Sequence, residues 1–225
     1  MSIRIVAAAV LLSGGVAAVL YGLRLLGDGL EKLLSVGADK FIGRAAGNPL
    51  SAYFSGLVIA GVTQSSTATS MSAVSMVSAG TCTLLSAAGL FMGANVGTTV
   101  TAQIFALTGG GIGRAVTGAA FLAIGAIASF GKGEKSKFSG DAAFGLGLIL
   151  CGLDSVGGNI SPIVSLPAVK SLLGCDNAVL CFLLGVLSTA ILQSSSAVTG
   201  VLVLLCERGE TTFYNAIFII LGSNI

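Results

Sequence analysis

Long apolar segments separated by short polar ones run through the whole chain. Residues 5–26, 83–107, 115–130 and 142–160 each approach or exceed the length of about 20 residues that an α-helix needs to cross a bilayer. Two further apolar stretches, 50–79 and 178–206, have polar centres. The pattern predicts an all-α, polytopic membrane protein.

The stretches 50–79 and 178–206 are predicted to form re-entrant hairpins. About 30 residues are long for one span but fit two half-length helices that meet at mid-membrane. Backbone at that depth leaves helical geometry only where protein or a cavity surrounds it. The polar centres, Gln64-Ser65-Ser66-Thr67 and Gln193-Ser194-Ser195-Ser196, are therefore expected at the hairpin tips.

These two centres belong to an internal duplication. Gln64 to Ala68 returns as Gln193 to Ala197, and Gly93-Ala94-Asn95 returns as Gly222-Ser223-Asn224, each time 129 positions later. The duplication predicts two related halves, residues 1–130 with hairpin 50–79 and residues 141–225 with hairpin 178–206. The second half ends inside the motif that the first copy completes, so it looks truncated, as expected of a fragment of a longer transporter.

The two halves are predicted to be inverted repeats. If each hairpin enters and leaves on one side, the first half crosses three times and the second half starts with the opposite orientation. One face then collects seven Lys and Arg side chains and the other four, which favours the first face as cytoplasmic. Each half also has a transmembrane helix predicted to be broken, at Gly93 to Thr99 and from Thr212 onward, and such paired elements characterise secondary transporters.

Other segments are predicted to lie outside the membrane core. The charged residues 28–48 are expected to form an interfacial amphipathic helix, after which Pro49 opens a new helix. Residues 131–140 are expected to be a polar loop between the halves, residues 161–174 take the place of the interfacial segment, and Gly109-Gly110-Gly111 is expected to be a turn.

Composition agrees with a membrane protein and argues against several functions. Only 9% of the residues are charged, against roughly 25% in soluble domains. A net charge of +2 without a long basic run gives no case for nucleic acid. The absence of histidine excludes a His-based triad or metal site, and no nucleophile is paired with a base, so neither an enzyme nor an organic cofactor is expected.

The duplicated motif can bind ions. Oxygen atoms of Ser, Thr, Asn and Gln suit an alkali cation, whereas the N–H groups that open a half-helix suit an anion. Two such tips meeting near mid-membrane would hold a small multivalent anion together with Na⁺. A lone Ser-Ser-Thr is typical of helix packing, but its duplication in register with Gly-x-Asn favours a binding site. The outer hydroxyls are interpreted as packing residues: Thr69, Ser70, Ser72, Ser75 and Ser78.

Asp154 is the one carboxylate well inside a predicted span. An acid in a membrane suggests Na⁺ coordination or proton transfer. Its counterpart in the first half is Arg24, near a helix end, so a structural position at the interface is an equal alternative.

The doubled motif, Gly93-Ala94-Asn95-Val96-Gly97-Thr98-Thr99 and residues 22–30 together resemble the type II sodium-dependent phosphate cotransporters and their bacterial relatives. The resemblance covers nearly the whole chain. It implies Na⁺-driven symport of inorganic phosphate across the bacterial cytoplasmic (inner) membrane by alternating access. The phosphate-binding residues implied are Gln64, Ser65, Ser66, Thr67, Gln193, Ser194, Ser195 and Ser196. The Na⁺-binding residues expected are Gln64, Ser66, Thr67, Asn95, Thr98, Thr99, Gln193, Ser195, Ser196 and Asn224.

Two alternatives stay open at this point. The anion could be sulfate or a small carboxylate, because the residues alone do not distinguish these from phosphate. A non-transporting membrane scaffold or sensor is the second alternative. The expected partners are phosphate, Na⁺ and the lipid bilayer, and the sequence is compatible with a homo-oligomer.

Overall fold

The computed structural model describes residues 2–34, 48–108, 112–175 and 177–225, and all regular secondary structure in these ranges is helical. Within these ranges, four helices are long and apolar enough to cross a membrane: Val6–Leu33, Leu84–Leu107, Ile112–Ser129 and Glu134–Asn159. A fifth span results if Pro167–Leu173 and Ala178–Leu192, bent by 113°, count as one. The prediction of an all-helical chain with several apolar spans is confirmed, whereas the inverted orientation of the repeats stays a prediction.

The chain divides into two compact units, each with one copy of the motif. The first-motif unit comprises Leu23–Gln103 and Phe121–Leu146. The second-motif unit comprises Met1–Gly22, Ile104–Ala120 and Gly147–Ile225. These units are defined by contacts in space, whereas the predicted halves 1–130 and 141–225 are defined by sequence similarity, and that division stays a prediction.

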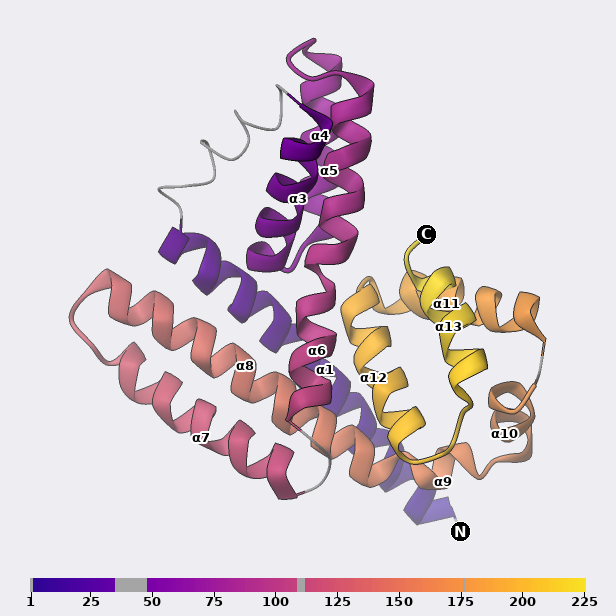
Figure 1. Ribbon diagram of the computed structural model, residues 1–225. Helices are drawn as coiled ribbons and strands as arrows, with labels where there is room; N and C mark the ends of the chain where they lie inside the picture. Colours follow the sequence, from indigo (N-terminus) through magenta and orange to yellow (C-terminus); the bar gives the residue numbers. More distant parts are fainter. Residues whose placement is uncertain (1, 35–47, 109–111, 176) are drawn as a thin grey trace. The chain divides into compact units, whose positions relative to one another are not determined.

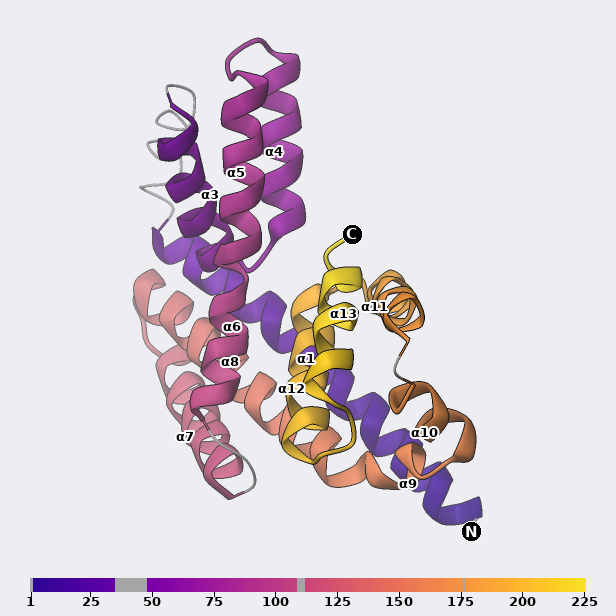
Figure 2. The same cartoon turned by 45° about the vertical axis from the view of Figure 1, so that its right-hand side comes forward.

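Three helices of the first-motif unit pack together: α3 (Pro49–Thr63), α4 (Ser66–Ser78) and α5 (Leu84–Gly97). Figures 1 and 2 show α3 and α4 alongside α5. As predicted, Pro49 lies in the first turn of a helix, and the Asn48 side chain caps it by accepting a hydrogen bond from the Leu50 N–H at 2.9 Å. Gly80, with φ +69°, ends α4, and its N–H donates to the Val77 carbonyl.

The second-motif unit repeats this group as α11 (Ala178–Leu192), α12 (Ser195–Glu207) and α13 (Phe213–Ser223), seen together in Figure 2. Asn177 caps α11, and Gly209, again with φ +69°, ends α12. Thr212 caps α13 as Thr83 caps α5. The duplication seen in the sequence is therefore also a duplication of local structure.

Both groups depend on a glycine at a helix contact. A Cβ atom at Gly93 of α5 would lie 1.9 Å from the Tyr53 carbonyl oxygen of α3. At the equivalent place, a Cβ at Gly222 of α13 would lie 2.0 Å from the Phe182 carbonyl oxygen of α11. The first glycine of Gly-x-Asn thus brings two helix backbones into contact, as small residues do in membrane proteins.

The predicted break after this glycine is smaller than expected. Only Thr98 separates α5 from α6 (Thr99–Leu107), and its φ of −69° and ψ of −15° remain in the α-helical region. The Thr98 N–H still donates to the Ala94 carbonyl at 3.1 Å. The expected break in this helix is therefore found, but it is confined to Thr98, because Gly93 and Gly97 serve close packing of α5 against α3.

Two segment boundaries also differ from the prediction. Helix α1 (Ser2–Leu34) continues past residue 26, so residues 28–34 belong to the first helix. Residues 35–47 and the turn expected at 109–111 lie outside the described residues.

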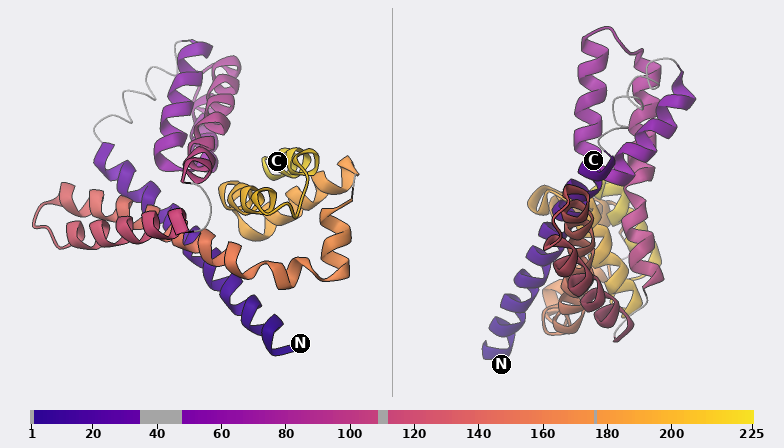
Figure 3. Two further views of the ribbon diagram at one scale, coloured as in Figure 1. Left: turned by 60° about the horizontal axis from the view of Figure 1, so that its bottom comes forward. Right: turned by 90° about the vertical axis from the view of Figure 1, so that its left-hand side faces the viewer.

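The predicted loop 131–140 is shorter than expected, because α8 (Glu134–Asn159) begins at Glu134. Helix α8 packs beside α7 (Ile112–Ser129), as Figure 3 shows. The Ser136 hydroxyl, which donates to the Ala128 carbonyl, ties the two helices at their turn. Residues 161–174 form the short helices α9 (Ser161–Val164) and α10 (Pro167–Leu173).

Candidate functional site

The two Gln-Ser pairs form the same tight turn between helices. Gln64 ends α3 with φ 52° and ψ 26°, and Gln193 ends α11 with φ 54° and ψ 26°. Within the described residues, they are the two non-glycine residues with positive φ. This left-handed conformation costs an ordinary residue roughly 1–2 kcal/mol. A strained glutamine at both equivalent positions suggests that the side chain, and not only the turn, is needed there.

A serine follows each glutamine and caps the next helix. The Ser65 Oγ accepts a hydrogen bond from the Ala68 N–H at 3.1 Å, and the Ser194 Oγ accepts one from the Ala197 N–H at 3.2 Å. The next residues, Ser66-Thr67 and Ser195-Ser196, form the first turns of α4 and α12. N–H groups in a first helical turn have no partner inside the helix and lie at its positive end. Each motif therefore combines hydroxyl groups with N–H donors suited to a small oxyanion.

The Gln64 side chain is held by two hydrogen bonds. Its Nε2 donates to the Gly61 carbonyl at 2.5 Å, and its Oε1 accepts from the hydroxyl of Thr101 on α6. Thr101 is buried, with 1% of its surface exposed. The Gln193 Nε2 donates likewise to the Ala190 carbonyl at 2.7 Å, but this side chain is exposed. Sequence reasoning missed Thr101, although the run of threonines from Thr98 onward was a signal.

The other residues expected to bind Na⁺ lie at the ends of α5 and α13. Asn95 and Asn224 are exposed. The Thr98 hydroxyl donates to the Asn95 carbonyl at 3.0 Å, and the Thr99 hydroxyl donates to the Val96 carbonyl at 2.7 Å. The roles of these residues stay predictions, since the structure brings Thr101, and not Asn95, into hydrogen-bonding contact with Gln64.

A cavity of about 380 Å³ lies beside the first motif. Its polar lining comes from α1 and from the motif helices: Asp28, Glu31, Thr63, Ser65, Thr69 and Ser72. Thr69 and Ser72, interpreted from the sequence as packing residues, thus face this cavity. Asp28 and Glu31 were not predicted to line a cavity, because the sequence analysis assigned them to the membrane interface by charge alone.

Asp154 lies on α8, five residues before its last residue Asn159, and is half-buried. This position is compatible with both of its predicted roles. Among the described residues, no three His, Cys, Asp or Glu side chains gather to hold a metal ion. That finding does not test the predicted Na⁺ ligands, which are mainly hydroxyl and amide oxygens.

Comparison with known proteins identifies the family. The chain is 27% identical over 209 residues to the uncharacterized protein YqeW of Bacillus subtilis (strain 168), an alignment covering 92% of this chain and 66% of that protein. The chain thus spans slightly less than two thirds of its relative's length. No solved structure matches the chain. The sequence model of the Na⁺/Pi-cotransporter family matches residues 19–157 and 168–225, which include both motifs. The chain therefore belongs to the Na⁺/Pi-cotransporter family.

Proposed function

We propose that this chain forms the binding core of a Na⁺-coupled symporter of inorganic phosphate in the bacterial cytoplasmic membrane. The observation that carries the proposal is the paired turn, in which Gln64 and Gln193 adopt the same strained conformation before a serine-capped helix. Each turn offers hydroxyl and N–H donors to an oxyanion. Membership of a transporter family, not one of enzymes, supports phosphate as the anion and Na⁺ as the coupled ion.

The helix lengths support hairpins that enter and leave the membrane on one side. Helices α3 and α11 have 15 residues each, and α4 and α12 have 13 each. At 1.5 Å per residue these helices are about 20–22 Å long, shorter than the roughly 30 Å of hydrocarbon. Each pair would reach the middle of the bilayer and return, with the Gln-Ser turn at its deepest point. Two such tips, in inverted repeats, would bind substrate between them during alternating access.

Phosphate binding to purified protein tests this proposal. Radiolabelled phosphate is expected to bind in Na⁺ but not in K⁺ or choline, and to resist competition by sulfate. Gln64→Gly and Gln193→Gly are the informative variants, because glycine accepts the positive φ of the turn and removes only the side chain. Each is expected to weaken phosphate binding at least tenfold.

The exposed Gln103 on α6 provides the matched control, since Gln103→Ala removes a glutamine side chain away from the turn. Stronger competition by sulfate than by phosphate would assign a different anion to the same site. Folded native protein without any Na⁺-dependent anion binding would contradict the proposal and favour a scaffold or sensor.

Thr101→Val is expected to weaken phosphate binding about two- to tenfold. The substitution preserves the size of a buried side chain but removes the hydroxyl that holds the Gln64 Oε1. A single hydrogen bond contributes roughly 0.5–1.5 kcal/mol, which sets the size of the effect. Titration with labelled phosphate measures it. Thr117→Val is the control, because that hydroxyl bonds only to the Gly113 carbonyl of its own helix, and an equal effect in both variants would contradict a special role for Thr101.

A further inference from the structure

Two cysteines that the proposed function does not use lie at the junction between α10 and α11. Cys175 follows α10 and belongs to neither helix, whereas Cys181 lies near the start of α11, where its N–H donates to the Asn177 carbonyl at 3.0 Å. The Cys181 thiol donates a hydrogen bond to the Cys175 carbonyl oxygen, with its sulfur 3.6 Å from that oxygen. The two cysteines are therefore neighbours in space.

Helix α13 holds both sides of this junction. At the end of α10, the Leu173 carbonyl accepts a hydrogen bond from the Asn215 Nδ2 at 2.9 Å, and Asn215 is fully buried in α13. On the other side, Gly185 lies one turn after the second cysteine and packs against α13, because a Cβ at this glycine would clash with a backbone carbonyl there. Contacts outside the linker thus keep the two cysteines close together.

The separation of the two cysteines fits a disulfide. A carbonyl oxygen lies about 2.4 Å from the Cα atom of its own residue, so the Cys181 Sγ lies within about 6 Å of the Cys175 Cα. Disulfide-bonded cysteines usually have Cα atoms about 4.4–6.8 Å apart. Because Cys175 lies outside both helices, side-chain rotation and a small backbone adjustment there can join the two sulfur atoms without unwinding either helix.

The two side chains differ in their access to a dissolved oxidant. Cys175 is half-buried, whereas Cys181 is 1% exposed, so an oxidant reaches Cys175 first. The predicted topology places Lys170 of α10, and with it this junction, on the face opposite to the cytoplasm. Disulfides form and persist on the oxidising outer side of a cell, whereas the cytoplasm keeps thiols reduced.

We propose that Cys175 and Cys181, both thiols in this structure, are a redox-active pair that forms a disulfide on contact with a disulfide oxidant. The Cys175 thiolate attacks one sulfur of the oxidant, which gives a mixed disulfide and releases one thiol. The Cys181 thiolate then attacks the Cys175 sulfur, forms the internal bond and releases the second thiol. The pair loses two electrons and two protons, and the oxidant gains them as two thiols. The bond joins the end of α10 covalently to the start of α11, the helix that ends at Gln193.

Oxidised glutathione added to the purified, reduced protein tests the proposal. After acid quenching and denaturation, the remaining thiols are alkylated with N-ethylmaleimide, and trypsin releases residues 171–208, which contain Cys175, Cys181 and Cys206. Mass spectrometry counts the adducts on this peptide. The reduced protein is expected to give three adducts, and the oxidised protein one adduct, on Cys206, with no glutathione retained.

Three single variants identify the bonded pair. Cys206→Ser is the matched control, and its peptide is expected to fall from two adducts to none on oxidation. Cys181→Ser is expected to retain glutathione on Cys175, because no second thiol displaces it, and Cys175→Ser is expected to keep its thiol at Cys181. A native peptide that keeps three adducts, retains glutathione on Cys175 or forms a disulfide with Cys206 would overturn the proposal.

Discussion

Gly93→Ala is expected to force α3 and α5 apart and to lower the free energy of unfolding by roughly 1–3 kcal/mol, the usual range for overpacking, or more. The added Cβ would lie 1.9 Å from the Tyr53 carbonyl oxygen and 2.8 Å from its carbonyl carbon. Both atoms belong to the backbone, so no side-chain rotation relieves the contact. Gly222→Ala should act in the same way on α11 and α13, because the added Cβ would lie 2.0 Å from the Phe182 carbonyl oxygen.

The buried cysteines report on this effect. Cys82 packs in an apolar cluster with Ala52, Ala87 and Leu90, within the α3–α5 group. Cys181, with 1% of its surface exposed, lies in α11. A thiol-reactive fluorophore added during heating should label Cys82 at a lower temperature in Gly93→Ala, and Cys181 at a lower temperature in Gly222→Ala.

Gly14→Ala is the matched control for both variants. Nothing lies within 4 Å of a Cβ at Gly14, and alanine favours a helix over glycine by about 1 kcal/mol. Its unfolding temperature should equal or exceed that of the native protein. If Gly93→Ala had the same unfolding temperature as the native protein, this result would contradict the close contact between α3 and α5.

The duplication made much of the local structure predictable. Each of the two Gln-Ser copies lies between apolar stretches that are too short to cross a membrane alone. This pattern predicted a break between helices at residues 64 and 193, and both breaks are found. The signals are local: serine is a strong helix cap, and Pro49 after Asn48 opens a helix. What the pattern does not contain is the left-handed conformation of glutamine itself, because this residue type has no preference for it.

Errors in the sequence prediction arose where charge was taken as a boundary. The charges from Asp28 onward suggested an interfacial segment, yet Gly27 serves a close helix contact and α1 runs through it to Leu34. The lysines after residue 131 suggested a loop, but charged residues are good helix formers and α8 begins at Glu134. The contact between Gln64 and Thr101 joins residues 37 positions apart, and tertiary packing alone determines it. The inverted orientation and the ion-binding roles stay predictions, since they depend on a membrane and on ligands.

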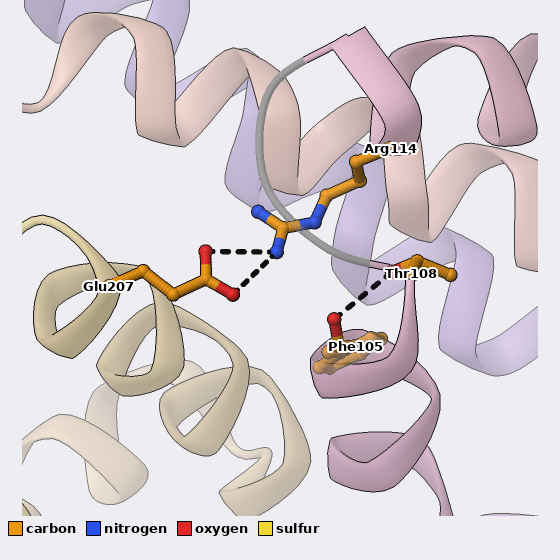
Figure 4. A network of polar contacts seen from close by, with 4 residues as sticks. All are labelled: Phe105, Thr108, Arg114 and Glu207. Carbon is orange, nitrogen blue, oxygen red and sulfur yellow. Dashed lines mark hydrogen bonds and ion pairs between the residues drawn. The ribbon is translucent and has the colours of Figure 1, made fainter.

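Glu207→Gln is expected to destabilise the second-motif unit by roughly 3 kcal/mol, the lower end of the range for breaking a buried ion pair. The Arg114 Nη2 lies 2.9 Å from both carboxylate oxygens of Glu207, which joins the start of α7 to the end of α12 (Figure 4). The Arg114 side chain is 2% exposed and that of Glu207 33% exposed. Glutamine would leave the guanidinium buried without a counter-charge, whereas Arg114→Met would leave a carboxylate that water still reaches. The glutamate variant should therefore be the less stable of the two in thermal unfolding.

The double variant Arg114→Met/Glu207→Met provides the control for this difference. Removing both charges also removes the cost of keeping them from water, so the double variant should recover most of the lost stability. The Arg114 Nε has no hydrogen-bond partner among the described residues, so the native pair already carries an unsatisfied donor. The double variant removes this donor as well, which allows its free energy of unfolding to match that of the native protein. Losses that simply add in the double variant would show that the two side chains are not coupled, and α7 and α12 would then be joined by apolar packing alone.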